Sequence, residues 1–332
     1  MKFIKKLRSG LLGAWKFFLK IWNHKKGRVG IIITGFVILV AIFAPVLTKY
    51  DPYDYDVTKG LQPPTAEHLL GTDKNGVDIL TELIYGTRIS LLVGLASGIG
   101  VTLLGAVLGV VAGYFGKVRS TIILNVINVM LVIPTLPLMI ILNKVSSSYV
   151  MMIFIFVAFG WSGTARMIRA QVLSVRESGY VRAAELSGAS RWYVMRRHIL
   201  PAVSNLLIMN CALSCAGFMI AEAGLSFIGL GDPNSMSWGK ILVRAQESAF
   251  TAGLWAWVLA PGAAIFLTVT GFMQIGYAIE DICNPRMVKK NAAAKSFSKL
   301  DEKSVGRVFA AMDDIPEPEC ATVDQPRKET IT

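Results

Sequence analysis

Ser162 is the side chain whose setting most readily suggests a chemical role, because it lies in the motif Gly-Trp-Ser-Gly at 160–163. A serine at the end of an apolar stretch can act as a protease nucleophile only if a histidine base lies within hydrogen-bond reach. The chain has three histidines, His24, His68 and His198, and none of them lies inside an apolar stretch. A membrane protease using Ser162 is therefore only a minor alternative, since the two glycines of the motif also suit close helix packing.

Other catalytic and cofactor patterns are missing from the sequence. The chain has no His-Glu-x-x-His zinc motif and no Gly-x-x-x-x-Gly-Lys-Ser/Thr phosphate-binding loop. Its four cysteines, at 211, 215, 283 and 320, match neither a disulfide framework nor a paired zinc motif. We predict no catalytic residue, no cofactor site and no metal site, so the chain is not expected to be an enzyme and any energy for work comes from elsewhere.

The hydropathy of the chain predicts an all-α, polytopic membrane protein. Of its 332 residues 53% are hydrophobic and 17% charged, and the mean hydropathy is +0.53. Six stretches without charged side chains are each long enough for a helix that crosses the hydrocarbon core, which needs about 20 residues. The predicted spans are about 29–48, 89–114, 121–142, 147–165, 201–221 and 253–279, within one membrane domain at 29–284.

The distribution of lysine and arginine predicts the orientation of these spans. Of the 34 basic residues, 27 fall in the two terminal segments and the two loops expected on the same side. Cytoplasmic loops carry the excess of positive charge, so both termini are predicted to be cytoplasmic in a cell membrane. The net charge of +12 is explained by this topology and does not require nucleic acid as a partner.

The segments outside the spans differ in character. Residues 1–28 repeat aromatic and aliphatic side chains at three- and four-residue steps among lysines, which predicts an uncleaved amphipathic helix in the cytoplasmic lipid interface. The acidic segment 49–87 is an expected extracytoplasmic loop, ending in a short helix that leads into the second span. The basic segment 166–200 is the expected cytoplasmic loop, and the tail 285–332 is expected to be disordered.

Two features inside the spans leave alternatives open. Small residues recur at four-residue steps along 94–113, which predicts close packing of another helix, either from this chain or from a second subunit. Polar side chains at membrane depth either bond to neighbouring helices or line a pathway. The candidates for a translocation path are Asn125, Asn128 and Asn210, the first two followed by a proline pair that allows a kink.

The segment 180–202, YVRAAELSGASRWYVMRRHILPA, predicts two short helices and a rigid connection to the fifth span. Residues 177–187 favour helix, and Gly188 can adopt the left-handed conformation that ends one. Ser190 can cap a second short helix, and Pro201 suits the first turn of the span. Ala183 and Ala184 would let the first helix sit deep in another protein's groove, so the segment would pass force directly to the span.

At this point the sequence resembles a known family, the membrane subunits of ATP-binding-cassette importers. Their cytoplasmic loop has the pattern Glu-Ala-Ala, three residues, Gly, nine residues, then Ile-x-Leu-Pro. Here Arg182, Ala183 and Ala184 take the first triplet, Gly188 the glycine, and Leu200 and Pro201 the end. Arg182 stands where the family pattern has its acidic residue, and His198 stands where it has its isoleucine. The stretches HLLGTDKNGVDILTELIYGTRISLLVG (68–94) and AGLSFIGLGDPNSMSWGKIL (223–242) look like the C-type permease of the dipeptide, oligopeptide and nickel branch.

The resemblance implies a type I importer permease fold with a cytoplasmic coupling helix. Expected partners are a homologous second permease forming a heterodimer, two cytoplasmic ATPases that bind ATP and Mg, and an extracytoplasmic solute-binding protein. The residues expected to couple to the ATPases are Arg182, Ala183, Ala184, Gly188, Arg191, Leu200 and Pro201. The implied function is ATP-driven import of short peptides, with import of nickel or another small solute, or a scaffold or sensor role, as alternatives.

Overall fold

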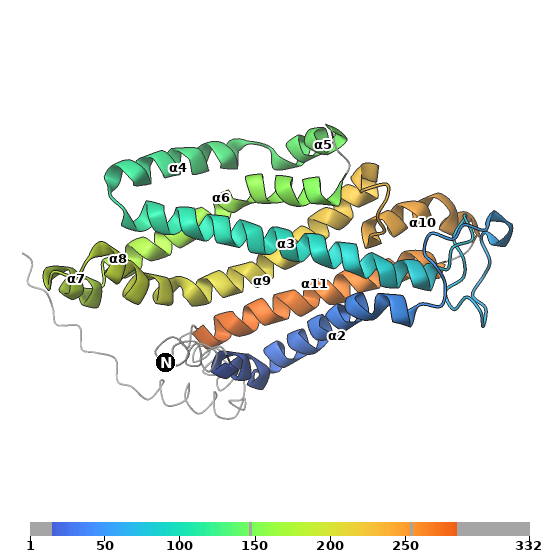
Figure 1. The fold of residues 1–332 in the computed structure, drawn as a ribbon, viewed down its shortest axis with the longest axis horizontal. Helices are drawn as coiled ribbons and strands as arrows, with labels where there is room; N and C mark the ends of the chain where they lie inside the picture. Colours follow the sequence, from blue (N-terminus) through green and yellow to red (C-terminus); the bar gives the residue numbers. More distant parts are fainter. Residues whose placement is uncertain (1–14, 146–147, 253–254, 284–332) are drawn as a thin grey trace, which may run out of the picture. The chain divides into compact units, whose positions relative to one another are not determined.

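The computed structural model describes residues 15–145, 148–252 and 255–283, and helices make up most of this part of the chain (Figure 1). The predicted tail 285–332 and residues 1–14 of the predicted N-terminal helix lie outside it. The longer helices are α2 (Lys25–Leu47), α3 (Ile79–Tyr114), α4 (Lys117–Val132), α5 (Thr135–Val145), α6 (Tyr149–Arg176), α9 (Leu200–Leu225), α10 (Trp238–Ala252) and α11 (Trp255–Cys283). The shorter ones are a 3₁₀ turn (Val57–Lys59), α7 (Gly179–Leu186), α8 (Arg191–Val194) and two π-helical turns, Met195–Ile199 and Ser226–Leu230.

Five helical runs in this part of the chain are long and apolar enough to cross a membrane, which confirms the all-α membrane class. They are α2, α3, α6, the run Arg191–Leu230 that contains α8 and α9, and α11. Several exceed the charge-free stretches from which they were predicted. α3 already begins at Ile79 and α6 continues to Arg176, because helix formation does not stop at the edge of the hydrocarbon.

The predicted third span, 121–142, is not one helix. It is divided between α4, which is shorter than a full crossing, and α5, with the break at Pro134. Ile133, the residue before the proline, is extended, with φ −65° and ψ 124°. The ring of a proline disfavours helical backbone at the residue before it, so the expected kink is instead an interruption.

The small residues of α3 pack against helices of this same chain. A Cβ atom added at Gly105, Gly109 or Gly113 would meet α6 at Thr164, Ile168 or Val172 within 2.9 Å. Gly94 and Gly98, further toward the start of α3, face Met219 and Cys215 of α9. Of the two alternatives for this stripe, the structure therefore shows internal packing, in which small residues let two backbones approach closely.

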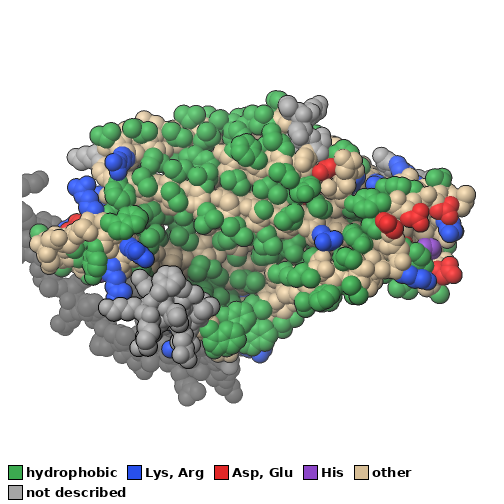
Figure 2. Space-filling model, in the orientation of Figure 1, with side chains coloured by type: hydrophobic (Ala, Val, Ile, Leu, Met, Phe, Trp, Pro, Cys, Tyr) green, Lys and Arg blue, Asp and Glu red, His purple; other side chains and the backbone are tan. Residues whose placement is uncertain are grey.

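The bundle of residues 15–283 has two polar ends (Figures 1 and 2). α7 and α8 lie at one, here named the coupling end, and the 48–78 segment and α10 lie at the other, the loop end. Hydrophobic side chains cover most of the face between them in Figure 2, whereas charged side chains gather toward the ends. Residues 15–23 are helical, and Ile21 packs on Ala278 and Ile279 of α11 while Trp15 and Trp22 stay exposed.

Candidate functional site

α7 is a short helix that is anchored by one side and exposed on the other. Val181 is fully buried, in a cluster that includes Val172 of α6 and Ile199 before α9. In contrast, Leu186 is 90% exposed, and Arg182 and Ala183 are exposed with it. The exposed side of α7 therefore presents one large apolar side chain together with small and basic ones.

The turn after α7 has the geometry that its glycine predicts. Gly188 adopts a φ of +78°, its N–H donates to the carbonyl of Glu185, and the N–H of Ala189 donates to that of Ala184, both at 3.1 Å. This pair of bonds is the Schellman motif, which closes a helix and redirects the chain. Ser190 then caps α8, its Oγ accepting from the N–H of Tyr193 at 3.3 Å.

The connection from α8 to α9 is a continuous helical run. Between them, residues 195–199 form a π-helical turn, in which the N–H of Leu200 donates to the carbonyl of Met195. Pro201 follows as the second residue of α9. A proline ring clashes with the carbonyl four residues earlier in a regular helix, and the wider turn relieves that clash. α8 is therefore joined to α9 without a flexible linker.

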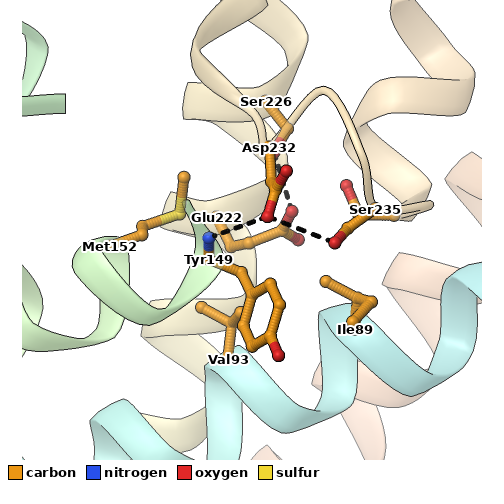
Figure 3. A pocket seen from close by; sticks show the side chains of 9 residues that line it. Ile89, Val93, Tyr149, Met152, Glu222, Ser226, Asp232 and Ser235 are labelled. Atoms are coloured by element: carbon orange, nitrogen blue, oxygen red, sulfur yellow. Dashed lines mark hydrogen bonds between the residues drawn. The ribbon is translucent and has the colours of Figure 1, made fainter. Parts of the chain in front are cut away.

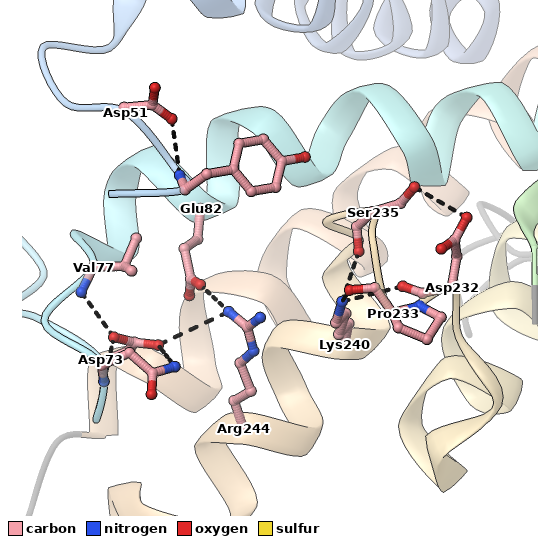
Figure 4. Close-up of polar contacts among 11 residues, drawn as sticks. Asp51, Asp73, Val77, Glu82, Asp232, Pro233, Ser235, Lys240 and Arg244 are labelled. Carbon is pink, nitrogen blue, oxygen red and sulfur yellow. Dashed lines mark hydrogen bonds and ion pairs between the residues drawn. The ribbon is translucent and has the colours of Figure 1, made fainter. Parts of the chain in front are cut away.

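At the loop end, Arg244 of α10 is held between two buried carboxylates (Figure 4). Its guanidinium forms an ion pair with Glu82 of α3, and a second with Asp73, 3.8 Å away. Asp73 also accepts from the N–H groups of Asn75 and Val77 at 2.8 Å, which shapes the turn before α3. Arg244 of α10 is thus joined to Glu82 of α3 by a charge-assisted hydrogen bond, the strongest kind in proteins, and to Asp73 of the 68–78 segment by an ion pair.

Lys240, one turn before Arg244, closes the neighbouring loop (Figure 4). Its Nζ donates to the carbonyls of Asp232 and Ser235 at 3.1 Å, and to that of Pro233. Burial, with a smaller effect of Arg244, lowers the pKa of Lys240 below its ordinary value. The partly buried ammonium group of Lys240 therefore helps to hold the turn of the segment 231–237.

Glu222 of α9 is a buried carboxyl near the loop end, 2% exposed (Figure 3). It accepts hydrogen bonds from Ser226 at 2.8 Å and from Ser90 of α3 at 3.0 Å, and Ser90 in turn accepts from the N–H of Trp238 at 3.1 Å. A cavity of about 10 Å³ beside it has room for about one water molecule. This cluster connects α9, α3 and the start of α10.

The three asparagines predicted to line a path are not brought together. Asn125 and Asn128 lie exposed on α4, and the Oδ1 of Asn128 accepts from Arg166 of α6 at 2.7 Å. Asn210 on α9 donates to Thr164 of α6 at 3.0 Å. The bonds of Asn128 and Asn210 agree with the simpler alternative, in which these side chains connect neighbouring helices. A role of the asparagines in lining a translocation path stays a prediction.

Comparison with known proteins identifies the family. The model of the binding-protein-dependent transport system inner membrane component matches residues 105–289, and that of the N-terminal membrane domain of oligopeptide transport permease C matches 13–64. A dipeptide transport system permease of Alkalihalophilus pseudofirmus is 34% identical, over 81% of this chain and 89% of its own. The chain belongs to this family of transport permeases. An oligopeptide transport system permease of Bacillus subtilis is 30% identical over 86% of this chain and 94% of its own. A protein of Brucella abortus that is described as a peptide transport system permease is 32% identical over 81% of this chain and 90% of its own.

The sequence alone missed the two loop-end clusters of this permease. In the sequence Glu222 directly follows the charge-free stretch 199–221, and Arg244 is one of the seven basic residues outside the predicted cytoplasmic segments. A buried carboxyl in a membrane helix nearly always has a specific partner. That general rule was the available signal, but it does not name Ser90, which lies 132 residues earlier in the chain.

Proposed function

We propose that this permease forms one half of the membrane channel of an ATP-driven importer of short peptides. The observation that carries the proposal is the coupling segment, in which the exposed helix α7 is connected through a rigid turn and a continuous helical run to α9. Among the relatives are proteins named as dipeptide and oligopeptide transport permeases, which supports peptides as the substrate class.

The proposed complex contains a second, homologous permease, two cytoplasmic ATPases and an extracytoplasmic solute-binding protein. ATP and Mg bind to the ATPases, and the permease itself catalyses no reaction. Both termini and the coupling end face the cytoplasm, so the loop end meets the solute-binding protein. Closure of the ATPases moves α7, and the residues Arg182, Ala183, Ala184, Gly188, Arg191, Leu200 and Pro201 carry that movement to α9.

The test is uptake by the complete complex in lipid vesicles, with labelled dipeptides and longer peptides in one arm and Ni²⁺ in the other. We expect ATP-dependent uptake of peptide. Uptake of Ni²⁺ without uptake of peptide would support the alternative in which the same kind of importer carries nickel. An unchanged rate for Ser162→Ala would remove the protease alternative.

Gly188 provides the variant that tests coupling. Proline cannot adopt its φ of +78° and removes the N–H that bonds to Glu185. We expect Gly188→Pro to abolish uptake while the complex still assembles. Gly188→Ala is the matched control: it keeps the N–H, an added Cβ meets no atom within 4 Å, and it carries only the strain of a left-handed residue, about 1–2 kcal/mol. Full uptake by Gly188→Pro would favour a scaffold or sensor instead.

A further inference from the structure

α3 contacts α7 directly through a hydrogen bond, and the residue that α3 contributes to it lies outside the segment 180–202. Tyr114, the last residue of α3, is 4% exposed and its hydroxyl donates to Glu185 of α7 at 3.2 Å. Its ring packs in the same cluster as Val181 and Ile199. Glu185 is the one acidic residue in α7, so the acidic side chain of this helix points to α3 and not only to solvent.

α3 is also built to transmit a displacement. It contains 36 residues and no proline, so it is about 54 Å long at 1.5 Å per residue, against about 30 Å of hydrocarbon. Sharp kinks in helices arise mainly at prolines, Gly/Ser pairs, π-turns or inserted side chains. α3 contains the pair Ser97–Gly98, but it is one unbroken α-helix from Ile79 to Tyr114. The glycine contacts described above fix its register against α6 and α9. A shift of Tyr114 along the helix axis is therefore expected to appear at the opposite end.

At that opposite end, α3 is joined to α10 and α9 by polar bonds. The indole N–H of Trp238 donates to the carbonyl of Leu83 at 3.0 Å, and its backbone N–H donates to Ser90 at 3.1 Å. Glu82 forms the ion pair with Arg244, and Ser90 donates to Glu222. These are the contacts through which a movement of α3 reaches the segment between α9 and α11.

We propose that α3 is a second mechanical link between the coupling end and the loop end, in parallel with α9, and that Tyr114 and Ser90 are its positioning residues. The inference rests on the proposed function, because it assigns a role within ATP-driven transport. α9 receives the movement of α7 through the covalent chain, whereas α3 receives it through the Tyr114–Glu185 bond. The loop end then senses both helices, so binding of the solute-binding protein and closure of the ATPases are linked by two routes.

The test compares ATP hydrolysed per peptide taken up by the complete complex in vesicles, with Tyr114→Phe, Glu185→Ala and Glu185→Gln. Tyr114→Phe removes only the hydroxyl and keeps the ring in its cluster. We expect it to raise the ratio of ATP to peptide about fivefold, the effect of losing one ordinary hydrogen bond of about 1 kcal/mol. Glu185→Ala should behave alike, Glu185→Gln should restore the wild-type ratio because its amide oxygen still accepts, and the double variant Tyr114→Phe/Glu185→Ala should be no worse than either change alone.

Tyr193→Phe is the matched control, since Tyr193 lies in the same segment but is 54% exposed. An unchanged ratio of ATP hydrolysed to peptide taken up in both Tyr114→Phe and Glu185→Ala would overturn the proposal. A smaller amount of assembled complex with an unchanged ratio would show that the bond only stabilises the structure, so it would overturn the proposal as well. Absence of ATP-driven uptake by the wild-type complex would be a different result, which removes the proposed function itself.

Discussion

Gly98 of α3 lies directly on the backbone of Cys215 of α9. A Cβ at position 98 would come within 2.6 Å of the Cys215 nitrogen and 2.5 Å of its sulfur. Real Cβ atoms do not approach backbone atoms so closely, so this contact requires glycine. It also explains Cys215 as a packing residue: the thiol fills the space left by the missing side chain, and among the described residues no cluster of metal-binding side chains is found.

Gly98→Ala is therefore expected to destabilise the permease, because the new methyl group must displace backbone and not a flexible side chain. Overpacking of this kind costs about 1–3 kcal/mol. The measurement is the thermal unfolding midpoint of the protein in detergent. Gly163→Ala in α6 is the control, since an added Cβ there meets nothing within 4 Å, and it should be neutral or stabilising by up to about 1 kcal/mol. Equal effects of the two substitutions would contradict the packing described for α3 and α9.

Glu222 should tolerate glutamine but not alanine. The bonds that Glu222 forms within the described chain come from serine hydroxyl groups, and the amide of glutamine can serve hydroxyls as both acceptor and donor. Alanine leaves those hydroxyls buried without a partner, which costs about 1–3 kcal/mol. The same unfolding measurement distinguishes the two variants. If Glu222→Gln were as damaging as Glu222→Ala, the negative charge itself would be required, and the hydrogen bonds from Ser226 and Ser90 would not account for the role of Glu222.

Arg244→Ala should loosen the loop end strongly. It leaves the carboxylates of Glu82 and Asp73, whose side chains are both 0% exposed, without their cation. Breaking a buried ion pair by removing one partner costs about 3–5 kcal/mol. Amide hydrogen exchange in the 48–78 segment measures the effect, and Arg244→Lys should be milder because the charge remains.

The control for Arg244 is Lys59→Ala in the same region. Lys59 pairs with Asp56 at 3.3 Å, but the two side chains are 59% and 42% exposed. Exposed pairs contribute about 0–1 kcal/mol, so exchange in the loop should barely change. A loop that is equally protected in Arg244→Ala and in the wild type would show that the ion pairs do not hold it.

Most of the fold was predictable because its determinants are local. A run of apolar residues requires a helix in lipid, wherever it lies in the chain. The end of α7 follows from Gly188, the cap of α8 from Ser190, and the entry to α9 from Pro201, each within a few residues of the feature it determines. The prediction was wrong where a local preference was underestimated: a kink was expected near Pro134, and the helix is interrupted there.

Contacts between distant residues could not be predicted in this way. Ser90 and Glu222 are 132 residues apart in sequence, and Glu82 and Arg244 are 162 apart. Which side chains meet depends on the rotation and register of each helix in the bundle, and a shift of one turn, about 5.4 Å, would exchange every partner.

The sequence by itself therefore determined that the chain crosses a membrane repeatedly and carries two short helices before α9, since hydropathy and helix-ending residues act over short distances. The tertiary structure alone decided that the glycines of α3 face this chain's own helices, that the asparagines lie apart, and that α3 is bonded at both ends. These outcomes depend on how closely particular surfaces fit, because in lipid the helices gain little from burial and associate through packing and a few polar bonds.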